Sequence, residues 1–110
     1  MLPDALRSEN VKIEGQLTKF QNNLRTLIQL KDEIGTERDN DDLRQKVNEK
    51  QKEMTTQAKD LQKQIDDYAQ ISVPYRSQRQ QQEKQEAYNK RLAEVVNKFK
   101  QEWQEIHVKM

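Results

Sequence analysis

The sequence predicts an all-α protein, an antiparallel up-down-up three-helix bundle with left-handed, coiled-coil-like packing. Apolar residues make up only 32% of the 110 residues, a balance that fits either disorder or long helices with a narrow apolar stripe. Because these residues recur at heptad spacing in three segments, the sequence predicts long helices and not disorder. Two short breaks separate the segments, so consecutive helices reverse direction and pack as neighbours. Three such stripes bury one another in a coiled-coil-like core.

The first predicted helix spans about residues 5–34. Its heptad positions are Ile13, Leu17, Phe20, Leu24, Leu27 and Ile34. Lys31 fills the one polar place, and we expect its aliphatic stem to cover the seam while the ammonium reaches water. On that interpretation Lys31→Leu is neutral or stabilising. Asp4 is the candidate N-cap of this helix.

The stretch IGTERDNDDLRQK, residues 34–46, predicts a tight reversal of the chain. Gly35 is a natural helix stop, since glycine enters the left-handed conformation without a steric penalty. Asp39 or Asn40 can cap the following helix. The two acids that come next, Asp41 and Asp42, suit the positive end of the helix dipole.

The second predicted helix spans about residues 41–70. Its apolar positions are Leu43, Val47, Met54, Leu61, Ile65 and Tyr68. Lys50 and Gln57 occupy the remaining places of the register. We expect truncation of a mid-helix core leucine such as Leu61 to cost roughly 2–5 kcal/mol of stability.

The third predicted helix spans about residues 75–107, with Pro74 at its start, where a missing N–H matters least. Ser72 or Ser77 is the candidate cap. The apolar positions are Tyr88, Leu92, Val96, Phe99, Trp103 and Ile106. The hairpin that leads into this helix also brings two acids toward two bases, and we expect these charges to neutralise one another: Asp66, Asp67, Arg76 and Arg79.

Composition argues against catalysis and nucleic-acid binding. The net charge is +1 and there is no cysteine, so we expect no thiol chemistry and no binding of duplex DNA or RNA at physiological salt. No apolar run is long enough for direct membrane insertion. The single histidine, His107, has no second metal ligand at a suitable spacing and is expected to be solvated. We therefore expect no enzyme activity, no cofactor and no metal.

The turn closely resembles the link between the first and second helices of endosomal syntaxins. The matching residues are Gly35, Thr36, Asp39, Leu43 and Arg44. The third segment is similar to the family's third helix, with Gln78-Arg79 near its start and Leu92 and Phe99 further on. The resemblance covers about residues 10–106.

The resemblance implies that residues 1–110 are the N-terminal regulatory Habc domain of an endosomal or vacuolar Qa-SNARE, acting in membrane fusion and vesicle trafficking. In that family a SNARE motif and a membrane anchor follow the domain, and would lie beyond Met110. The implied partners are SNARE motifs, of the same chain or another, and SM proteins or other trafficking regulators. The implied location is the cytoplasmic face of endosomal or vacuolar membranes.

The resemblance also places a candidate binding site in a groove between the second and third helices, where the SNARE motif lies in syntaxins that close. We expect the groove to be lined by residues just off the core stripe. The candidates are Gln51 and Ala58 on the second helix, and Gln81, Tyr88, Val95 and Glu102 on the third. Tyr88 and Val95 could instead widen the core face, as on many globular helices.

Two other classes of protein have comparable helices. A spectrin-like structural repeat is similar in length, but its characteristic tryptophan lies in the first helix, whereas Trp103 lies in the third. An oligomeric coiled coil is opposed by the breaks at Gly35 and Pro74. A general helical interaction module remains an alternative, and we expect a monomer because one chain can bury all three stripes.

Overall fold

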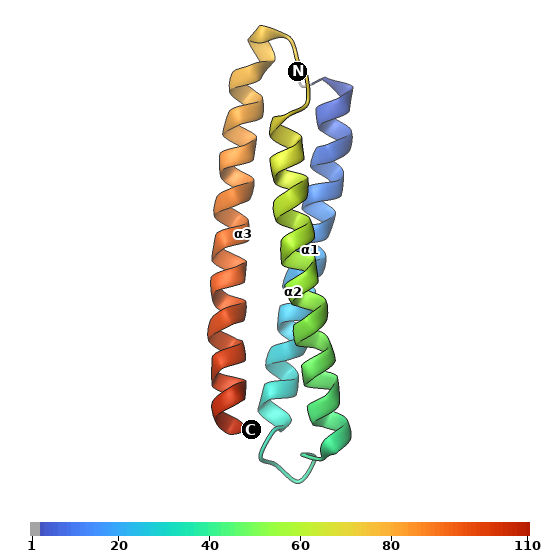
Figure 1. The fold of residues 1–110 in the computed structure, drawn as a ribbon, viewed down its shortest axis with the longest axis vertical. Coiled ribbons are helices and arrows are strands. Elements are labelled where there is room, and N and C mark those ends of the chain that lie inside the picture. The colour runs from blue at the N-terminus through green and yellow to red at the C-terminus, as the bar shows by residue number, and fades with distance from the viewer. Residues whose placement is uncertain (1–2) are drawn as a thin grey trace.

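A computed structural model describes residues 3–110 and contains three long helices (Figure 1). The helices are α1 (Asp4–Glu33), α2 (Asp41–Ala69) and α3 (Tyr75–Lys109). They lie antiparallel in sequence order and form a rod of 59 × 19 × 18 Å. The predicted all-α three-helix bundle is confirmed, and each predicted helix end lies within two residues of the observed one.

The starts of α1 and α3 differ from the predicted caps. The N-cap residues are Pro3 and Pro74, and neither helix start has a side-chain cap hydrogen bond. Asp4 is the first residue of α1 rather than its cap, and Ser72 and Ser77 do not cap α3. The prolines fit these positions because their fixed φ, −56° in both cases, leads into a helix and no N–H is wasted.

The end of α1 is set by Gly35, whose φ of 85° lies in the left-handed region. Only glycine adopts this conformation without a steric penalty from a Cβ atom. The N–H of Thr36 donates to the carbonyl of Glu33 at 3.2 Å, and the Thr36 hydroxyl donates to the same carbonyl at 2.6 Å. The predicted helix stop at Gly35 is confirmed.

The two candidate caps of α2 have separate roles. Asn40 is the cap, since its Oδ1 accepts from the N–H of Leu43 at 2.8 Å. The Asp39 carboxylate instead closes the turn: Oδ2 accepts from the N–H of Gly35 at 3.0 Å, and both oxygens accept from the Arg44 guanidinium at 3.0–3.1 Å. Asp39 therefore joins the end of α1 to the first turn of α2.

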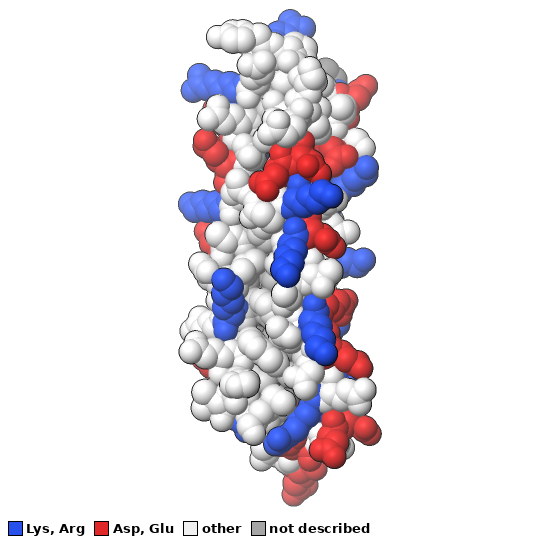
Figure 2. Space-filling view, in the orientation of Figure 1, with Lys and Arg blue, Asp and Glu red and all other residues white. Residues whose placement is uncertain are grey.

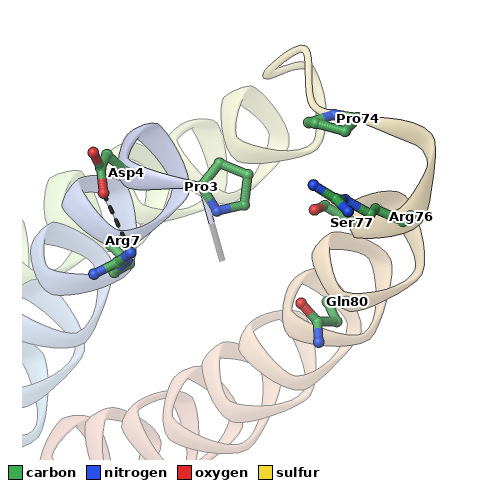
Figure 3. A pocket seen from close by; sticks show the side chains of 7 residues that line it. All are labelled: Pro3, Asp4, Arg7, Pro74, Arg76, Ser77 and Gln80. Atoms are coloured by element: carbon green, nitrogen blue, oxygen red, sulfur yellow. Dashed lines mark ion pairs between the residues drawn. The ribbon is translucent and has the colours of Figure 1, made fainter. Parts of the chain in front are cut away.

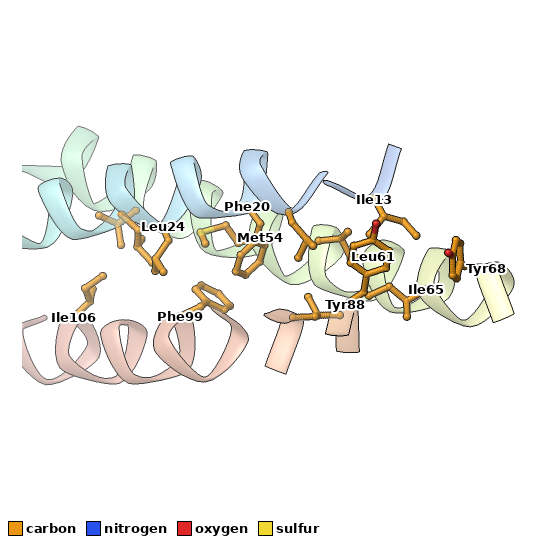
Figure 4. Close-up of a cluster of buried hydrophobic side chains, with 14 of the residues drawn as sticks. Ile13, Phe20, Leu24, Met54, Leu61, Ile65, Tyr68, Tyr88, Phe99 and Ile106 are labelled. Atoms are coloured by element: carbon orange, nitrogen blue, oxygen red, sulfur yellow. The ribbon is translucent and has the colours of Figure 1, made fainter. Parts of the chain in front are cut away.

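The core runs the whole length of the rod (Figure 4). Phe20 of α1 meets Phe99 of α3 edge to face, with ring centroids 5.8 Å apart. Tyr68 of α2 and Tyr88 of α3 pack in the same way at 5.9 Å. Such edge-to-face pairs add to the stabilisation from apolar burial. Leu61 is 1% exposed, in agreement with the predicted core.

The register of α3 differs from the predicted one in two places. Val96 and Trp103 are only partly buried, whereas Glu102 is 5% exposed. Val95 and Tyr88 lie seven and fourteen residues before Glu102 in the same heptad row. Glu102 therefore takes the core place predicted for Trp103, while Val95 and Val96 are both partly buried.

The predicted charge neutralisation at the α2–α3 hairpin is wrong. Arg79 pairs with Glu83 on its own helix at 3.2 Å, and Asp66 accepts from Gln62 at 3.1 Å. Within residues 3–110 no ion pair joins Asp66 or Asp67 to the arginines that begin α3. Exposed i,i+4 neighbours are reached at less entropic cost than partners across a hairpin.

The turn generates a pH-dependent prediction. Arg44 first, and the N–H of Gly35 second, hold the pKa of Asp39 below its usual value. A depressed carboxyl pKa gives stability that is present above the unfolded-state pKa and lost as the pH falls through the folded-state pKa. Asp39→Asn is therefore expected to lower the denaturation midpoint at pH 7, with the difference from the wild type disappearing near pH 2.

The control is Glu37→Gln, in the same turn. Glu37 is exposed and makes no ion pair with any described residue, so this change is expected to leave the midpoint unaltered at both pH values. Equal effects of the two changes at pH 7 would show that the turn responds to net charge and not to the Asp39–Arg44 pair.

Candidate protein-binding groove

A shallow groove of about 440 Å³ lies between α2 and α3 near the middle of the rod. Its lining residues are Ala58, Lys59 and Gln62 from α2, and Asn89, Leu92, Ala93 and Val96 from α3. On the face of the rod drawn in Figure 2, a strip of uncharged side chains runs lengthwise over α3 and α2, with Lys and Arg side chains along it.

The groove has an apolar floor and polar edges. Ala58, Ala93 and Val96 are small or branched side chains that leave the floor shallow, and Ala58 and Val96 pack against the core beneath. At one end Gln62 Nε2 donates to Asn89 Oδ1 at 3.2 Å and so bridges the two helices. Such a surface suits the apolar face of another helix, because small side chains let helix axes approach closely.

Two predicted site residues lie on α2, and the structure places them differently. Ala58 lines the groove, in agreement with its expected position. Gln51 is half-buried one heptad earlier, does not line this groove, and donates from Nε2 to Thr55 Oγ1 at 3.1 Å. The structure therefore shows only Ala58 on the groove surface, and binding by either residue stays a prediction.

The four predicted site residues of α3 do not line the groove. Tyr88 is 2% exposed and its hydroxyl donates across to Asn10 Oδ1 of α1 at 2.9 Å. Burial first, and the nearby Glu14 carboxylate second, raise the pKa of the Tyr88 phenol. Val95 is half-buried and packs against the core. Tyr88 thus faces α1, and Tyr88 and Val95 widen the core face of α3.

Gln81, the first residue of that row, acts as a buried cap. It is 7% exposed, and its Nε2 donates to the carbonyls of Tyr68 at 2.9 Å and Ile71 at 2.8 Å. The last carbonyls of a helix have no intrahelical donor, so Gln81 satisfies the end of α2 from the neighbouring helix.

Glu102, the last residue of the row, is held in the core face by lysines. Lys31 of α1 donates to Glu102 Oε2 and, at 2.8 Å, to Glu105, while Lys98 lies 3.1 Å from Glu102 Oε1. Lys31 first, with Lys98 adding to it, lowers the pKa of Glu102 despite the opposing effect of burial, and both acids raise the pKa of Lys31. The Lys31 side chain is 16% exposed, so its predicted reach to free water is wrong.

Val96 and Ala93 line the groove although the sequence predicted Val96 in the core and Glu102 on the surface. The available signal was Lys31: a lysine in a heptad seam position favours a buried acid on a facing helix, because the attraction between the two charges offsets part of the cost of removing each from water. Glu102, at the same end of the rod, is that acid.

Neither a metal site nor a membrane span is found in the described chain. Over residues 3–110 no cluster of three or more His, Cys, Asp or Glu side chains could hold a metal ion, and no helix is both long and apolar enough to cross a bilayer. His107 is exposed beside Trp103, with ring centroids 6.3 Å apart.

Comparison of the sequence with known protein families identifies the class of this helical domain. A family model described as a syntaxin-like protein matches residues 10–110. The chain therefore belongs to the syntaxin-like family, whose domains are of the SNARE regulatory type, and this match favours that class over a spectrin-like repeat. No curated protein and no solved structure matches the chain.

The lysine–glutamate cluster reverses the expectation for Lys31. Lys31→Leu is expected to lower the free energy of unfolding by about 1–3 kcal/mol at pH 7, because Glu102 stays buried with only Lys98 as its partner. The loss should shrink in acid, since the depressed carboxyl pKa means that the pair contributes only while Glu102 is ionised. Urea melts at pH 7 and pH 2.5 measure both values.

The double variant Lys31→Leu/Glu102→Leu removes both charges and is expected to recover most of the lost stability, since two apolar side chains carry no desolvation cost. A single Lys31→Leu variant more stable than the wild type would contradict the cluster and restore the earlier interpretation of Lys31.

Proposed function

We propose that this chain is the N-terminal Habc domain of an endosomal or vacuolar syntaxin, and that its α2–α3 groove receives a SNARE motif as a fourth helix. The observation that carries the proposal is the groove itself, with an apolar floor of Ala58, Leu92, Ala93 and Val96 between two helices of a syntaxin-like bundle. A fourth amphipathic helix laid there would extend the coiled-coil-like packing.

The polar edges support a reversible contact. Lys59 and the Gln62–Asn89 bridge border the apolar floor, so a bound helix would bury only a narrow stripe. Interfaces of small area with polar rims are typical of transient association. Reversibility suits a regulatory domain, which must release the SNARE motif before that motif can join other SNARE helices in membrane fusion.

The endosomal or vacuolar subtype and the further partners are inferred from the turn between α1 and α2. The residues that carry the endosomal resemblance, Gly35, Thr36, Asp39, Leu43 and Arg44, all take part in the hydrogen bonds or backbone geometry that reverse the chain. The resemblance supports action at the cytoplasmic face of endosomal or vacuolar membranes, with SM proteins or other trafficking regulators as further partners.

The groove is tested by adding the downstream SNARE segment to residues 1–110, as a peptide or in the same chain, and following backbone amide shifts. We expect shifts concentrated near Ala58, Asn89, Ala93 and Val96. Ala93→Glu is expected to abolish them by placing a charge on the apolar floor, without unfolding the bundle, because Ala93 is exposed.

The matched control is Ala87→Glu, which introduces the same charge at another exposed alanine of α3, outside the groove. This control is expected to leave the shifts intact. Val95→Glu is a poor probe, because Val95 packs against the core and a charge there should destabilise the fold. An absence of any shift with the wild-type domain would refute groove binding and leave the family assignment untouched.

A further inference from the structure

The amino-terminal segment of α1, residues 4–14, is joined to the rest of the helix by Gly15. In a helix interior glycine is less favourable than any residue except proline. Nothing in the structure requires a glycine here, because Gly15 is exposed, its φ is not positive, and a Cβ atom at this position would meet no atom within 4 Å. Gly15 is therefore a weak point within α1.

Polar contacts hold the amino-terminal segment to α3. Asn10 occupies the heptad position between Leu6 and Ile13, which are both fully buried. Its Oδ1 accepts from the Tyr88 hydroxyl at 2.9 Å, and Glu14 Oε1 lies 3.3 Å from the same hydroxyl. A hydroxyl has only one hydrogen to donate, so the two acceptors share a single donor.

A buried hydroxyl beneath the segment has no hydrogen-bond partner. Tyr68 of α2 is 0% exposed, and its ring packs edge to face against Tyr88. Its hydroxyl lies beside Asn10 but completes no hydrogen bond within residues 3–110. Gln64 Oε1, one turn earlier on α2, is also buried without a partner in that range. Unpaired buried polar atoms are unfavourable, so water that reached the Tyr68 hydroxyl would remove a cost of the closed arrangement.

A cleft of about 640 Å³ separates the start of the segment from the start of α3 (Figure 3). Its lining residues are Pro3, Asp4 and Arg7 on the α1 side, and Pro74, Arg76, Ser77 and Gln80 on the α3 side. The ion pair drawn in Figure 3, Asp4 with Arg7 at 3.3 Å, lies within α1. The first turns of the two helices are therefore not packed tightly against each other.

The part of α1 that follows Gly15 is held differently. Its buried side chains over residues 17–27 are all apolar: Leu17, Phe20, Leu24 and Leu27. Phe20 also packs edge to face against Phe99 of α3 at 5.8 Å. The change from a seam with a polar place to an apolar seam thus falls at the glycine.

We propose that the amino-terminal segment detaches from the bundle as one unit, with Gly15 as the hinge, while the rest of α1 stays packed. Detachment breaks the contacts of Asn10 and Glu14 with Tyr88, and it uncovers the Tyr68 and Tyr88 rings. Apolar side chains of the segment leave the core in the same step, so the opened form is a minor state. A segment with two positions is an element that a regulatory step can bias. This opening is separate from the α2–α3 groove and independent of its function.

Native-state hydrogen exchange of the 110-residue chain, followed by NMR in urea below the unfolding transition, tests the proposal. We expect the amides of residues 8–14 to share one opening free energy and to exchange about tenfold or more faster than those of residues 20–27, relative to their intrinsic rates. Their exchange should depend little on urea, because the opening exposes little surface. A gradual rise in protection along α1 would indicate ordinary fraying of the helix end and would overturn the proposal.

Gly15→Ala is expected to slow the exchange of residues 8–14 about fivefold, because alanine favours the helix at the hinge and its Cβ has room. The matched control is Thr18→Ala, which places the same residue at another exposed position of α1. Thr18 stays helical in both forms, so this change should slow only the exchange that requires global unfolding. Equal slowing of residues 8–14 by both changes would contradict a hinge at Gly15.

Tyr88→Phe removes the hydroxyl that Asn10 and Glu14 share and keeps the aromatic ring. We expect the amides of residues 8–14 to exchange about tenfold faster, in line with the loss of a buried hydrogen bond. Circular dichroism checks that the variant keeps its helix content. Unaltered exchange of residues 8–14 would show that these contacts do not close the segment.

Discussion

The narrowness of the apolar stripe governs this structure. The three helices have 30, 29 and 35 residues, but only six, six and four of these residues are both apolar and buried. No single stripe stabilises its own helix, so all three must be buried against one another along their full length. The chain must therefore reverse its direction sharply at two places, near Gly35 and near Pro74. Any polar residue within a stripe must also find an ion-pair or hydrogen-bond partner on a neighbouring helix.

The sequence was sufficient for the architecture because its signals were local. Heptad spacing marks a helix without knowledge of its neighbours, and Gly35 and Pro74 mark helix ends by backbone conformation alone. The choice of which α3 residues are buried, by contrast, depends on a residue of another helix. Trp103 is far more apolar than Glu102, yet Glu102 is the buried residue of the two, because Lys31 on another helix makes a buried glutamate tolerable.

The same reason explains how far the groove could be predicted. The resemblance pointed to the space between α2 and α3, and the structure places Ala58 on the surface of a groove there; binding in that groove stays a prediction. The α3 side of the groove was not predicted, since an error of one residue in a helix turns a side chain by about 100°. Gln81 shows the effect most clearly: a glutamine expected on a surface is a buried donor that completes the end of α2.

The lysine–glutamate cluster also determines how the rod would respond to a mechanical load. Lys31 ties the last turn of α1 to Glu102 and Glu105, and Lys109 donates back to the carbonyl of Lys31 at 3.3 Å. A force applied to the carboxyl end of α3 would break these few contacts between α3 and α1 one after another. Only then would it separate the apolar side chains of the core. Peeling would then begin at these ion pairs, and the more exposed Lys31–Glu105 pair would weaken first as the ionic strength rises.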